Sequence, residues 1–259
     1  MFNIYCQNIW NTLPAHERMP MIRSLISDFD ADICLFQECS PNTVRKCENA
    51  IPALMADEYK EICEHLIPTN YTPVFYKKDK FDLIDEGYLL YDGLNDYASK
   101  SVSWAVLKDK ESGKMLAAAS THFWWMYRDD EDTKQRIANA DQLRHVCDAI
   151  VSKYNVPVIV GGDFNNGQNS VQGSAPYEYM LKNGFVDFRL VANNTTDKFT
   201  HRDCPGGIAT ESMPTVQNLD YIFYYGKNNV SVAEFDVLTS KKALESSDHC
   251  PLVGKFDIE

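Results

Sequence analysis

Apolar residues along this chain follow two different spacings, and each spacing predicts a different element. Residues 33–36 and 156–160 form short apolar runs, which are typical of buried strands, and residues 2–6 form a further strand-like segment. Other apolar residues recur every three or four positions and predict two amphipathic helices, the first on Met21, Ile22, Leu25, Ile26 and Phe29, the second on Ile137, Ala140, Leu143, Val146, Cys147, Ile150 and Val151. A shorter helix is expected around residues 177–181.

The middle of the chain carries stronger strand signals. Residues 71–76 and 81–90 flank the polar segment 77–80, and residues 102–107 and 114–121 flank the turn 111–113, so both pairs are predicted to form antiparallel hairpins. Ser40 before Pro41 is a favourable helix start, because serine can cap a first turn into which proline fits. With two or three C-terminal strands, this mixture predicts an α+β or layered α/β sandwich, with sheet packed on sheet and helices outside.

The length and composition favour one domain over residues 1–259. The chain has 259 residues, 44% of them hydrophobic, which is enough for a sizeable core. It has no apolar run as long as a membrane span needs, and its first residues lack the features of a signal peptide, so a cytoplasmic location is expected. The eight cysteines are scattered without a C-x-x-C pair, and we expect reduced, mostly buried thiols rather than a zinc site.

The charge of the chain bears on its partners. The formal net charge is −12, whereas non-specific binding to DNA depends on lysine and arginine side chains that neutralise phosphates. We therefore do not expect long duplex DNA to be a partner. A local basic groove around Lys77, Lys78 and Lys80 is the feature that would contradict this expectation.

Residues 158–165 form the most specific candidate for a site. An apolar strand runs through Gly161 and Gly162, which permit a tight exit, into Asp163, Phe164 and Asn165. If the extended geometry persists, Asp163 and Asn165 lie on one side and Phe164 points into the core. A turn-forming Asp and Asn could produce the same letters without chemistry. The strongly apolar strand before them favours a carboxylate and an amide that are presented together.

Other strands also end or begin at polar residues, which are Asn8, Glu38, His122, Asp220 and the pair Asp248-His249. A carboxylate that follows a buried strand, such as Glu38, is well placed as a ligand for a hard cation. An acid such as Asp220 can orient a histidine by accepting its N–H. Taken singly, each residue has an ordinary alternative as a loop acid, a turn former, a helix cap or a histidine satisfied in the core.

Two adjacent tryptophans directly follow the strand end at His122. Trp124 and Trp125 could stack on a base or another ring of a substrate, because large aromatic side chains offer a broad apolar face. They could equally pack a loop, and the sequence leaves both interpretations open.

The polar strand ends are more informative as a set. Carboxylates and amides with few histidines favour Mg²⁺ or Mn²⁺ over zinc. The sequence contains no serine nucleophile elbow, glycine-rich nucleotide loop or zinc-ligand spacing that would indicate another chemistry. The set therefore predicts a Mg²⁺ or Mn²⁺ site rather than a zinc site.

These residues lie in six short segments that resemble the endonuclease/exonuclease/phosphatase superfamily, the deoxyribonuclease I-like fold. In chain order the segments are Gln7-Asn8-Ile9-Trp10, Phe36-Gln37-Glu38, Ser120-Thr121-His122, Gly162-Asp163-Phe164-Asn165, Leu219-Asp220-Tyr221-Ile222-Phe223 and Ser247-Asp248-His249. They span nearly the whole chain, and six in order are far less common by chance than one. The resemblance implies a four-layered α/β/β/α sandwich with a site at one edge of two packed sheets. The pair Asn218-Leu219 and the segment 124–132 depart from the family pattern.

The resemblance also implies a role for each of the polar positions. Glu38 would be the principal metal ligand, supported by Asp248, and Asn8 would help to place Glu38 and the scissile phosphate. Asp163 would orient or deprotonate the attacking water, while Asn165 would donate hydrogen bonds to the phosphoryl oxygens.

The histidines complete this assignment. His249 would contact or protonate the phosphoryl group, steadied by Asp220, and His122 would be a second phosphate contact or a general acid. Superfamily members cleave DNA, RNA tails, sphingomyelin, inositol phosphates and other phosphoesters, so the resemblance implies the reaction type better than the substrate. We expect a Mg²⁺- or Mn²⁺-dependent hydrolase of a phosphorylated small molecule, lipid headgroup or nucleotide. A nuclease acting on DNA or RNA is the alternative, and a catalytically silent binding module is a remote one.

Overall fold

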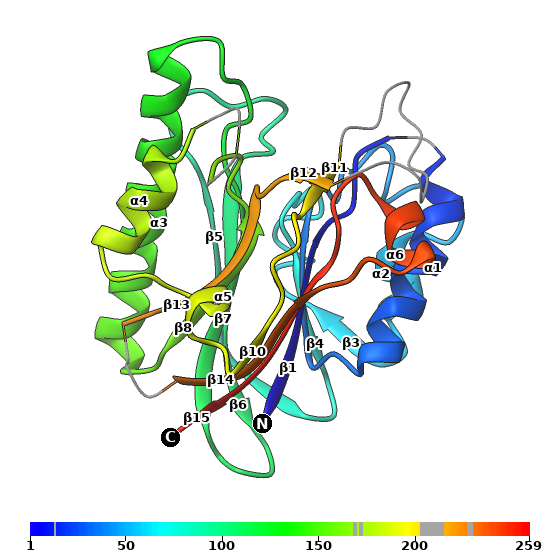
Figure 1. The fold of residues 1–259 in the computed structure, drawn as a ribbon. Helices are drawn as coiled ribbons and strands as arrows, with labels where there is room; N and C mark the ends of the chain where they lie inside the picture. The colour runs from blue at the N-terminus through cyan, green and yellow to red at the C-terminus, as the bar shows by residue number, and fades with distance from the viewer. Residues whose placement is uncertain (13, 168–169, 171–172, 203–214, 227–229) are drawn as a thin grey trace.

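A computed structural model describes residues 1–12, 14–167, 170, 173–202, 215–226 and 230–259 (Figure 1). The first of its two large sheets has seven strands, in the spatial order β10 (Asn194–Thr195), β14 (Val230–Val237), β15 (Leu252–Ile258), β1 (Phe2–Asn8), β2 (Ile33–Gln37), β4 (Val74–Lys77) and β3 (Tyr59–Glu61). In this sheet β1 pairs in parallel with β2 and antiparallel with β15.

The second sheet has six strands, in the order β5 (Phe81–Leu90), β6 (Ser101–Asp109), β7 (Met115–His122), β8 (Val158–Asp163), β13 (Asp220–Tyr225) and β9 (Val186–Asp187). The strands β7 and β8 are parallel, and β13 is antiparallel to β8. The short strands β11 (His201–Arg202) and β12 (Thr215–Gln217) form a separate pair.

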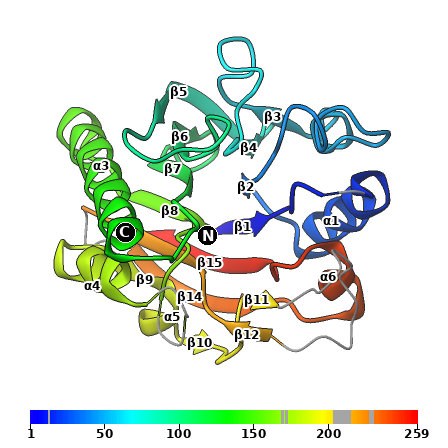
Figure 2. The same ribbon diagram turned by 90° about the horizontal axis from the view of Figure 1, so that it is seen from above.

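Helices cover the outer face of each sheet. On the first sheet lie α1 (Ala15–Phe29), α2 (Ile51–Met55) and α6 (Lys241–Ser246), and on the second lie α3 (Asp130–Tyr154) and α4 (Ala175–Lys182) (Figures 1 and 2). The one-turn helix α5 (Phe188–Val191) contacts β13 and β14. The result is the predicted four-layered α/β/β/α sandwich. Among the helices of the described residues, none is long and apolar enough to cross a lipid bilayer.

The burial of β2 explains why its sequence is continuously apolar. Leu35 points into the central cluster between the two sheets, where it meets residues such as Ile159, whereas Phe36 points into the cluster beneath α1. Successive side chains of a strand face opposite sides of the sheet, so a strand covered on both faces needs apolar residues at every position. A third cluster, which includes Leu143, fills the space between the second sheet and α3.

The predicted helices form, and their ends follow ordinary capping chemistry. The helix α1 ends at Asp30, whose left-handed conformation (φ 57°) lets its N–H reach the carbonyls of Ile26 and Ser27. The helix α3 begins at Asp129, whose side chain accepts hydrogen bonds from the N–H groups of Glu131 and Asp132. It starts earlier than the apolar spacing indicates, because polar residues continue its buried face toward the N-terminus.

One of the two predicted hairpins is wrong. Residues 102–107 and 114–121 do pair, as β6 with β7. In contrast, β4 and β5 belong to different sheets, so the polar segment between them crosses from one sheet to the other. The physical reason is that β2 and β3 occupy both edges of β4, which leaves no edge for β5.

The helix predicted at Ser40-Pro41 is also wrong, since residues 41–46 form turns and the next helix begins at Ile51. The Ser40 hydroxyl does accept hydrogen bonds from the N–H groups of Thr43 and Val44, at 3.3 and 3.4 Å. The turn does not continue as a helix, and the Arg45 side chain donates to the carbonyls of Cys39 and Asn70.

The thiols are placed much as expected. Cys6, Cys34, Cys39, Cys63 and Cys147 are buried free thiols, whereas Cys204 lies outside the described residues.

Candidate active site

Strand direction brings three of the six motifs to one edge of the first sheet. Because β1 and β2 are parallel, Asn8 at the end of β1 lies beside Gln37 at the end of β2, and Glu38 follows directly. The neighbouring strand β15 runs the opposite way, so the residues that precede it, Asp248 and His249, reach the same edge.

The other three motifs meet at the corresponding edge of the second sheet. His122 ends β7 and is in register with Asp163, which ends the parallel strand β8. Asp220 begins the antiparallel strand β13 and is also in register with Asp163. Phe164 is buried against the aromatic rings of Phe123 and Tyr221, as predicted for a residue that points into the core.

Two glycines just before Asp163 permit close packing, Gly161 against the facing sheet and Gly162 against the neighbouring strand β7. A Cβ on Gly161 would lie 2.6 Å from Leu35 Cδ1 of the facing sheet, and a Cβ on Gly162 would lie 2.1 Å from the carbonyl oxygen of Thr121. Both glycines lie within β8. The prediction that they permit a tight exit from the strand is therefore wrong, and their small size serves close packing instead.

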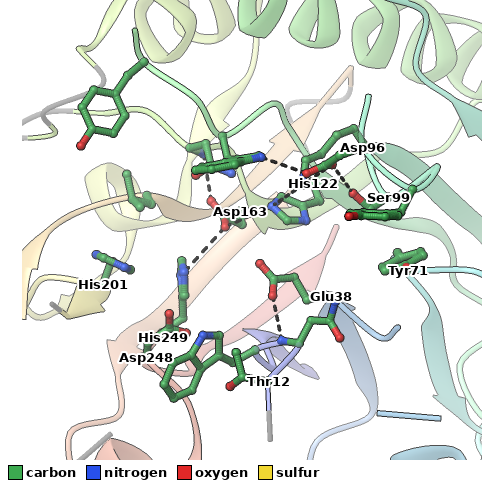
Figure 3. Close-up of a pocket in the computed structure, with 18 of the residues that line it drawn as sticks. Thr12, Glu38, Tyr71, Asp96, Ser99, His122, Asp163, His201, Asp248 and His249 are labelled. Atoms are coloured by element: carbon green, nitrogen blue, oxygen red, sulfur yellow. Dashed lines mark hydrogen bonds and ion pairs between the residues drawn. The ribbon is translucent and has the colours of Figure 1, made fainter. Parts of the chain in front are cut away.

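The two edges enclose a cavity of about 750 Å³ (Figure 3). Six of the eight predicted polar site residues line it, namely Glu38, His122, Asp163, Asn165, Asp248 and His249. Asn8 and Asp220 do not line the cavity, but each holds residues that do.

Asn8 joins the two sheets through its side-chain amide. Its Nδ2 donates hydrogen bonds to Glu38 Oε1 at 3.1 Å and to Asp163 Oδ2 at 3.0 Å. The other oxygen of Glu38 accepts the N–H of Asn11 at 2.8 Å, and Glu38 itself has a left-handed conformation (φ 60°). Asn8 thus fixes two carboxylates that come from different sheets.

Asp220 holds His249 in the predicted pair. Asp220 Oδ2 lies 2.8 Å from His249 Nδ1 and also accepts the hydroxyl of Thr200 at 2.7 Å. Burial acts to lower the pKa of His249, but the carboxylates of Asp220, Asp163 and Asp248 outweigh it and raise the pKa well above its usual value. His249 is therefore an imidazolium at neutral pH, with Nε2 3.8 Å from Asp163 Oδ2.

His122 has the opposite electrostatic character. Its Nε2 lies 3.4 Å from Asp163 Oδ2 and 3.4 Å from the ammonium nitrogen of Lys100. Burial, and then the charges of Lys100 and His249, lower its pKa well below 6.5, so the ring is neutral at pH 7.

Asp163 lies between the two histidines. Burial raises the pKa of its carboxyl group to about 7, because desolvation and the charge of Asp220 outweigh the attraction of His249 and the hydrogen bonds from Asn165 and Asn8. Near neutral pH this group can therefore both hold and release a proton.

Asp248 and Glu38 form the acidic side of the cavity (Figure 3). Burial raises the pKa of Asp248 to about 6; the charge of His249 opposes this and that of Glu38 adds to it. Carboxylates that line one cavity repel each other until a cation neutralises them, and carboxylate oxygens are the ligands that Mg²⁺ and Mn²⁺ prefer. The residues present therefore fit the predicted divalent metal ion.

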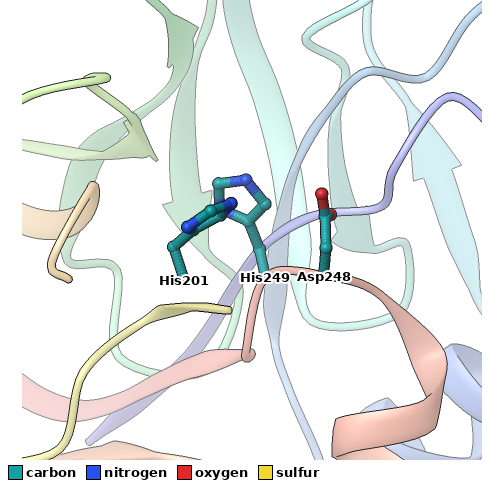
Figure 4. A group of neighbouring side chains, drawn as sticks. All are labelled: His201, Asp248 and His249. Carbon is teal, nitrogen blue, oxygen red and sulfur yellow. The ribbon is translucent and has the colours of Figure 1, made fainter. Parts of the chain in front are cut away.

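A histidine that sequence analysis did not identify adds a second set of donors. His201, Asp248 and His249 bring ligand atoms within 4.8 Å of one another (Figure 4). Asp163, Asp220 and His249 do the same. In both groups His249 is already held by Asp220, and burial lowers the pKa of His201 to about 3, with the charge of His249 adding to the effect.

The structure separates the two tryptophans. Trp125 lines the cavity, is 44% exposed, and donates its indole N–H to Asp96 at 2.9 Å. Trp124 is buried, and its N–H groups donate to Asn139 and Asp132 of α3. Of the two interpretations that the sequence left open, Trp124 therefore matches loop packing, whereas Trp125 is placed where a substrate could meet it.

Two buried cations near the site also escaped sequence analysis. Lys100 lines the cavity wall and directly precedes β6. Arg18 donates to the carbonyls of Ile9, Trp10, Thr12 and Ser246 and so ties α1 to the loop after β1 and to the end of α6. Both are single basic residues without a local motif, and only the tertiary fold brings them to the site.

The lysines considered as a basic groove lie elsewhere. Lys77 and Lys80 pair with Asp32, which directly precedes β2, whereas Glu38 directly follows it. They therefore lie at the opposite end of the sheet from the cavity. Acidic residues, including Glu58 and Glu111, share their groove.

Comparison with known proteins finds similarity in structure only. No protein-family model matches the sequence, and no curated protein matches it. A mannosyl-6-phosphatase of Bacteroides thetaiotaomicron VPI-5482 is similar, with a TM-score of 0.80 and 19% identity over 100% of both chains. An endonuclease/exonuclease/phosphatase from Bacteroides vulgatus gives 0.78 and 22%, over 100% of this chain and 99% of that one. The human Nocturnin catalytic domain with bound sulfate gives 0.72 and 20%, over 100% and 94%. The chain therefore has the fold of the endonuclease/exonuclease/phosphatase superfamily, as its six motifs predicted.

Proposed function

We propose that this protein is a Mg²⁺- or Mn²⁺-dependent hydrolase of phosphoric ester bonds. The observation that carries the proposal is the convergence of six polar strand ends on one cavity, with Asn8 joining Glu38 to Asp163 and with Asp220 holding His249. A carboxylate pair, a buried acid with a raised pKa and an oriented imidazolium are the groups that attack by water on an anionic phosphorus centre requires.

Small or exposed phosphorylated molecules are the proposed substrates, including sugar phosphates, lipid headgroups and nucleotides. The net charge of −12 and the position of Lys77 and Lys80 away from the cavity both oppose binding of long duplex DNA. Among the structural neighbours, one is described as a mannosyl-6-phosphatase, and one, from D. rerio, is complexed with a single-stranded DNA product.

Glu38 and Asp248 are the proposed metal ligands, with Asn8 placing Glu38. When bound, the metal ion would neutralise negative charge on the phosphoryl oxygens and on these two acids. Asn8 itself acts through Glu38 and Asp163, since both of its amide hydrogen bonds go to these carboxylates.

Asp163 is proposed to orient the attacking water and to accept its proton. It lies at the cavity wall with a pKa near 7, which suits a group that must be a base at neutral pH and must then release the proton. Asn165, which also lines the cavity, is proposed to donate a hydrogen bond to a phosphoryl oxygen.

The two histidines are proposed to have different roles. His249 is charged and held by Asp220, so it can donate a hydrogen bond or a proton to the phosphoryl group through Nε2. His122 is neutral at pH 7 because its pKa is well below 6.5. Of the two roles expected for His122, a phosphate contact is therefore favoured over a general acid.

A screen of phosphorylated metabolites, lipid headgroups and oligonucleotides tests this function. Turnover is expected with Mg²⁺ or Mn²⁺ and should stop in excess chelator. Glu38→Gln should abolish turnover without unfolding the protein, because it removes the charge of a proposed metal ligand while keeping its size. Calorimetry should show that the variant loses metal affinity, whereas unchanged affinity would remove Glu38 from the metal site.

The outcome of the screen also separates the alternatives. Hydrolysis of undamaged duplex DNA at the rate of a dedicated nuclease would replace the proposed substrate class with nucleic acid. Specific binding of a phosphorylated molecule without turnover, at saturating Mg²⁺ and Mn²⁺, would leave a binding module.

A further inference from the structure

Lys100 stands out among the residues that form the cavity. Of the described residues that line it, Lys100 is the one lysine or arginine, against the four carboxylates of Glu38, Asp96, Asp163 and Asp248. Its side chain is 5% exposed. A substrate with a negatively charged phosphoryl group would be repelled by this lining unless cations meet it.

The ammonium group of Lys100 is incompletely paired within the protein. Its nitrogen lies 3.4 Å from Asp96 Oδ1 and 3.4 Å from His122 Nε2. These distances are long for charge-assisted hydrogen bonds, which are usually about 2.7–2.9 Å. A buried ammonium carries three donors and is costly to desolvate unless anions or acceptors satisfy it. The geometry leaves donor capacity at the cavity wall beside His122.

The backbone fixes the position of Lys100. Its N–H donates to Asn95 Oδ1 at 3.0 Å, and its carbonyl oxygen accepts from Asn95 Nδ2 at 2.8 Å and from the N–H of Tyr91 at 3.0 Å. Gln135 of α3 ties the same loop down through Asp92 and Leu94. The loop between β5 and β6 therefore presents its lysine from a rigid support.

Lys100 lies on the side of the cavity opposite Asp248, one of the two proposed metal ligands. Asp96 and His122, which lie beside the Lys100 ammonium group, are across the cavity from Asp248 and His201 (Figure 3). A phosphoryl group between the two sides would meet a positive charge on each.

We propose that Lys100 binds a non-bridging oxygen of the substrate's phosphoryl group and makes the site selective for phosphomonoester dianions over phosphodiester monoanions. This inference rests on the proposed function and narrows its substrate class. The dianion carries a second formal charge, which gains more from an additional buried cation than the single charge of a diester does. His122 is neutral and can supply a hydrogen bond at this place but no charge.

A purely structural role is the alternative, in which Lys100 only pairs with Asp96. That role predicts lower stability on substitution and an equal loss for every ligand. A matched control is Lys114, which pairs with Asp257 at 2.8 Å and lies at the end of the β6–β7 hairpin remote from His122.

Calorimetry at pH 8 with saturating Mg²⁺ tests binding without turnover, with inorganic phosphate as the dianion and dimethyl phosphate as the monoanion. Lys100→Met should weaken phosphate binding by about 10- to 100-fold, the range for a hydrogen bond to a charged group. Dimethyl phosphate binding should change much less. Lys100→Arg should retain part of the preference, and Lys114→Met all of it. Unchanged phosphate affinity in a folded Lys100→Met protein, or equal losses for both ligands, would overturn the proposal.

Kinetics with p-nitrophenyl phosphate and bis(p-nitrophenyl) phosphate keep this inference separate from the proposed function. Lys100→Met should lower kcat/KM for the monoester far more than for the diester. Turnover with equal losses for both esters would refute the selectivity while leaving the hydrolase intact. Selective phosphate binding by a wild-type protein that hydrolyses no ester in the wider screen would refute the hydrolase while leaving the role of Lys100.

Discussion

The pair formed by Asp220 and His249 shows how a buried carboxylate at one strand end determines the protonation state of a histidine at another. His249 carries a proton at neutral pH because three carboxylates surround it, of which Asp220 is in direct contact at 2.8 Å. Without Asp220, less negative charge would offset the desolvation that lowers the pKa of His249. The two side chains should therefore act as one unit.

A double-mutant cycle tests this unity. Asp220→Asn and His249→Ala should each lower kcat by about 10²–10⁴-fold, the range for loss of a positioned acid or base. The double variant should be little worse than the worse single one, because residues that act together have non-additive effects. The measurement is kcat at saturating metal, with thermal unfolding as the control for folding. Fully additive losses would mean that the residues act independently.

The two tryptophans differ in their neighbours, and that difference predicts their effects. Trp125→Ala should raise KM for the best substrate by about 2- to 10-fold, the range for loss of one aromatic contact. Trp124→Phe keeps a ring but removes the hydrogen bond to Asp132, so it should lower the melting temperature and leave KM unchanged. Steady-state kinetics and thermal unfolding of both variants decide the point. An unchanged KM in Trp125→Ala would leave that residue with a packing role only.

At the scale of elements, strand direction and sheet packing bring the site residues together, and no single residue in the sequence indicates this arrangement. The sequence predicts β1, β2 and β8 correctly, because strands buried on both faces are apolar at every position. It fails at β4 and β5, since a polar turn between two strand-like runs has the same appearance whether the chain folds back or crosses to another sheet. Only the edges already taken by β2 and β3 decide between these outcomes.

The close approach of the sheets at Gly161 makes a prediction about stability. Gly161→Ala places a methyl group 2.6 Å from Leu35 Cδ1, so the free energy of unfolding should fall by about 1–3 kcal/mol, as for other overpacked cores. Leu35→Val removes that contact atom. The double variant should therefore lose less than the sum of the two single losses in urea unfolding. Additive losses in the free energy of unfolding would show that the added methyl group is accommodated by separation of the sheets and not by movement of the Leu35 side chain.

At the scale of the whole molecule, the sequence predicts the four layers. It also predicts the eight polar residues that the structure brings together, because each lies at or near the end of a recognisable strand. It does not predict Lys100 or His201. Lys100 lies in a loop and His201 in a two-residue strand, and each reaches the cavity only through contacts with distant segments. The same limit applies to Trp124 and Trp125, whose directions depend on acceptors offered by α3 and by Asp96.

The acidic side of the cavity links metal binding to stability, with a definite dependence on pH. Burial raises the pKa of Asp248 to about 6 in the folded protein, above its ordinary value of 3.8. Between these values the folded state holds a proton that the unfolded state has released, so the free energy of unfolding falls as pH rises through this window. Without metal, the ionised carboxylate of Asp248 therefore destabilises the fold at pH 7.

Asp248→Asn should consequently be more stable than the wild-type protein in chelator at pH 7, and this advantage should vanish below pH 4. Because Asp248 is partly exposed, solvent screening reduces the gain to about 1–2 kcal/mol. Adding Mg²⁺ should reverse the order, because only the wild-type site binds the ion tightly and is stabilised by it. Urea unfolding at pH 3.8, 5 and 7, in chelator and in Mg²⁺, measures each term. A variant that is less stable than wild type in chelator at pH 7 would contradict this prediction. It would mean that the contacts of Asp248 with Ser247 and His249 stabilise the folded protein by more than the burial of its charge destabilises it.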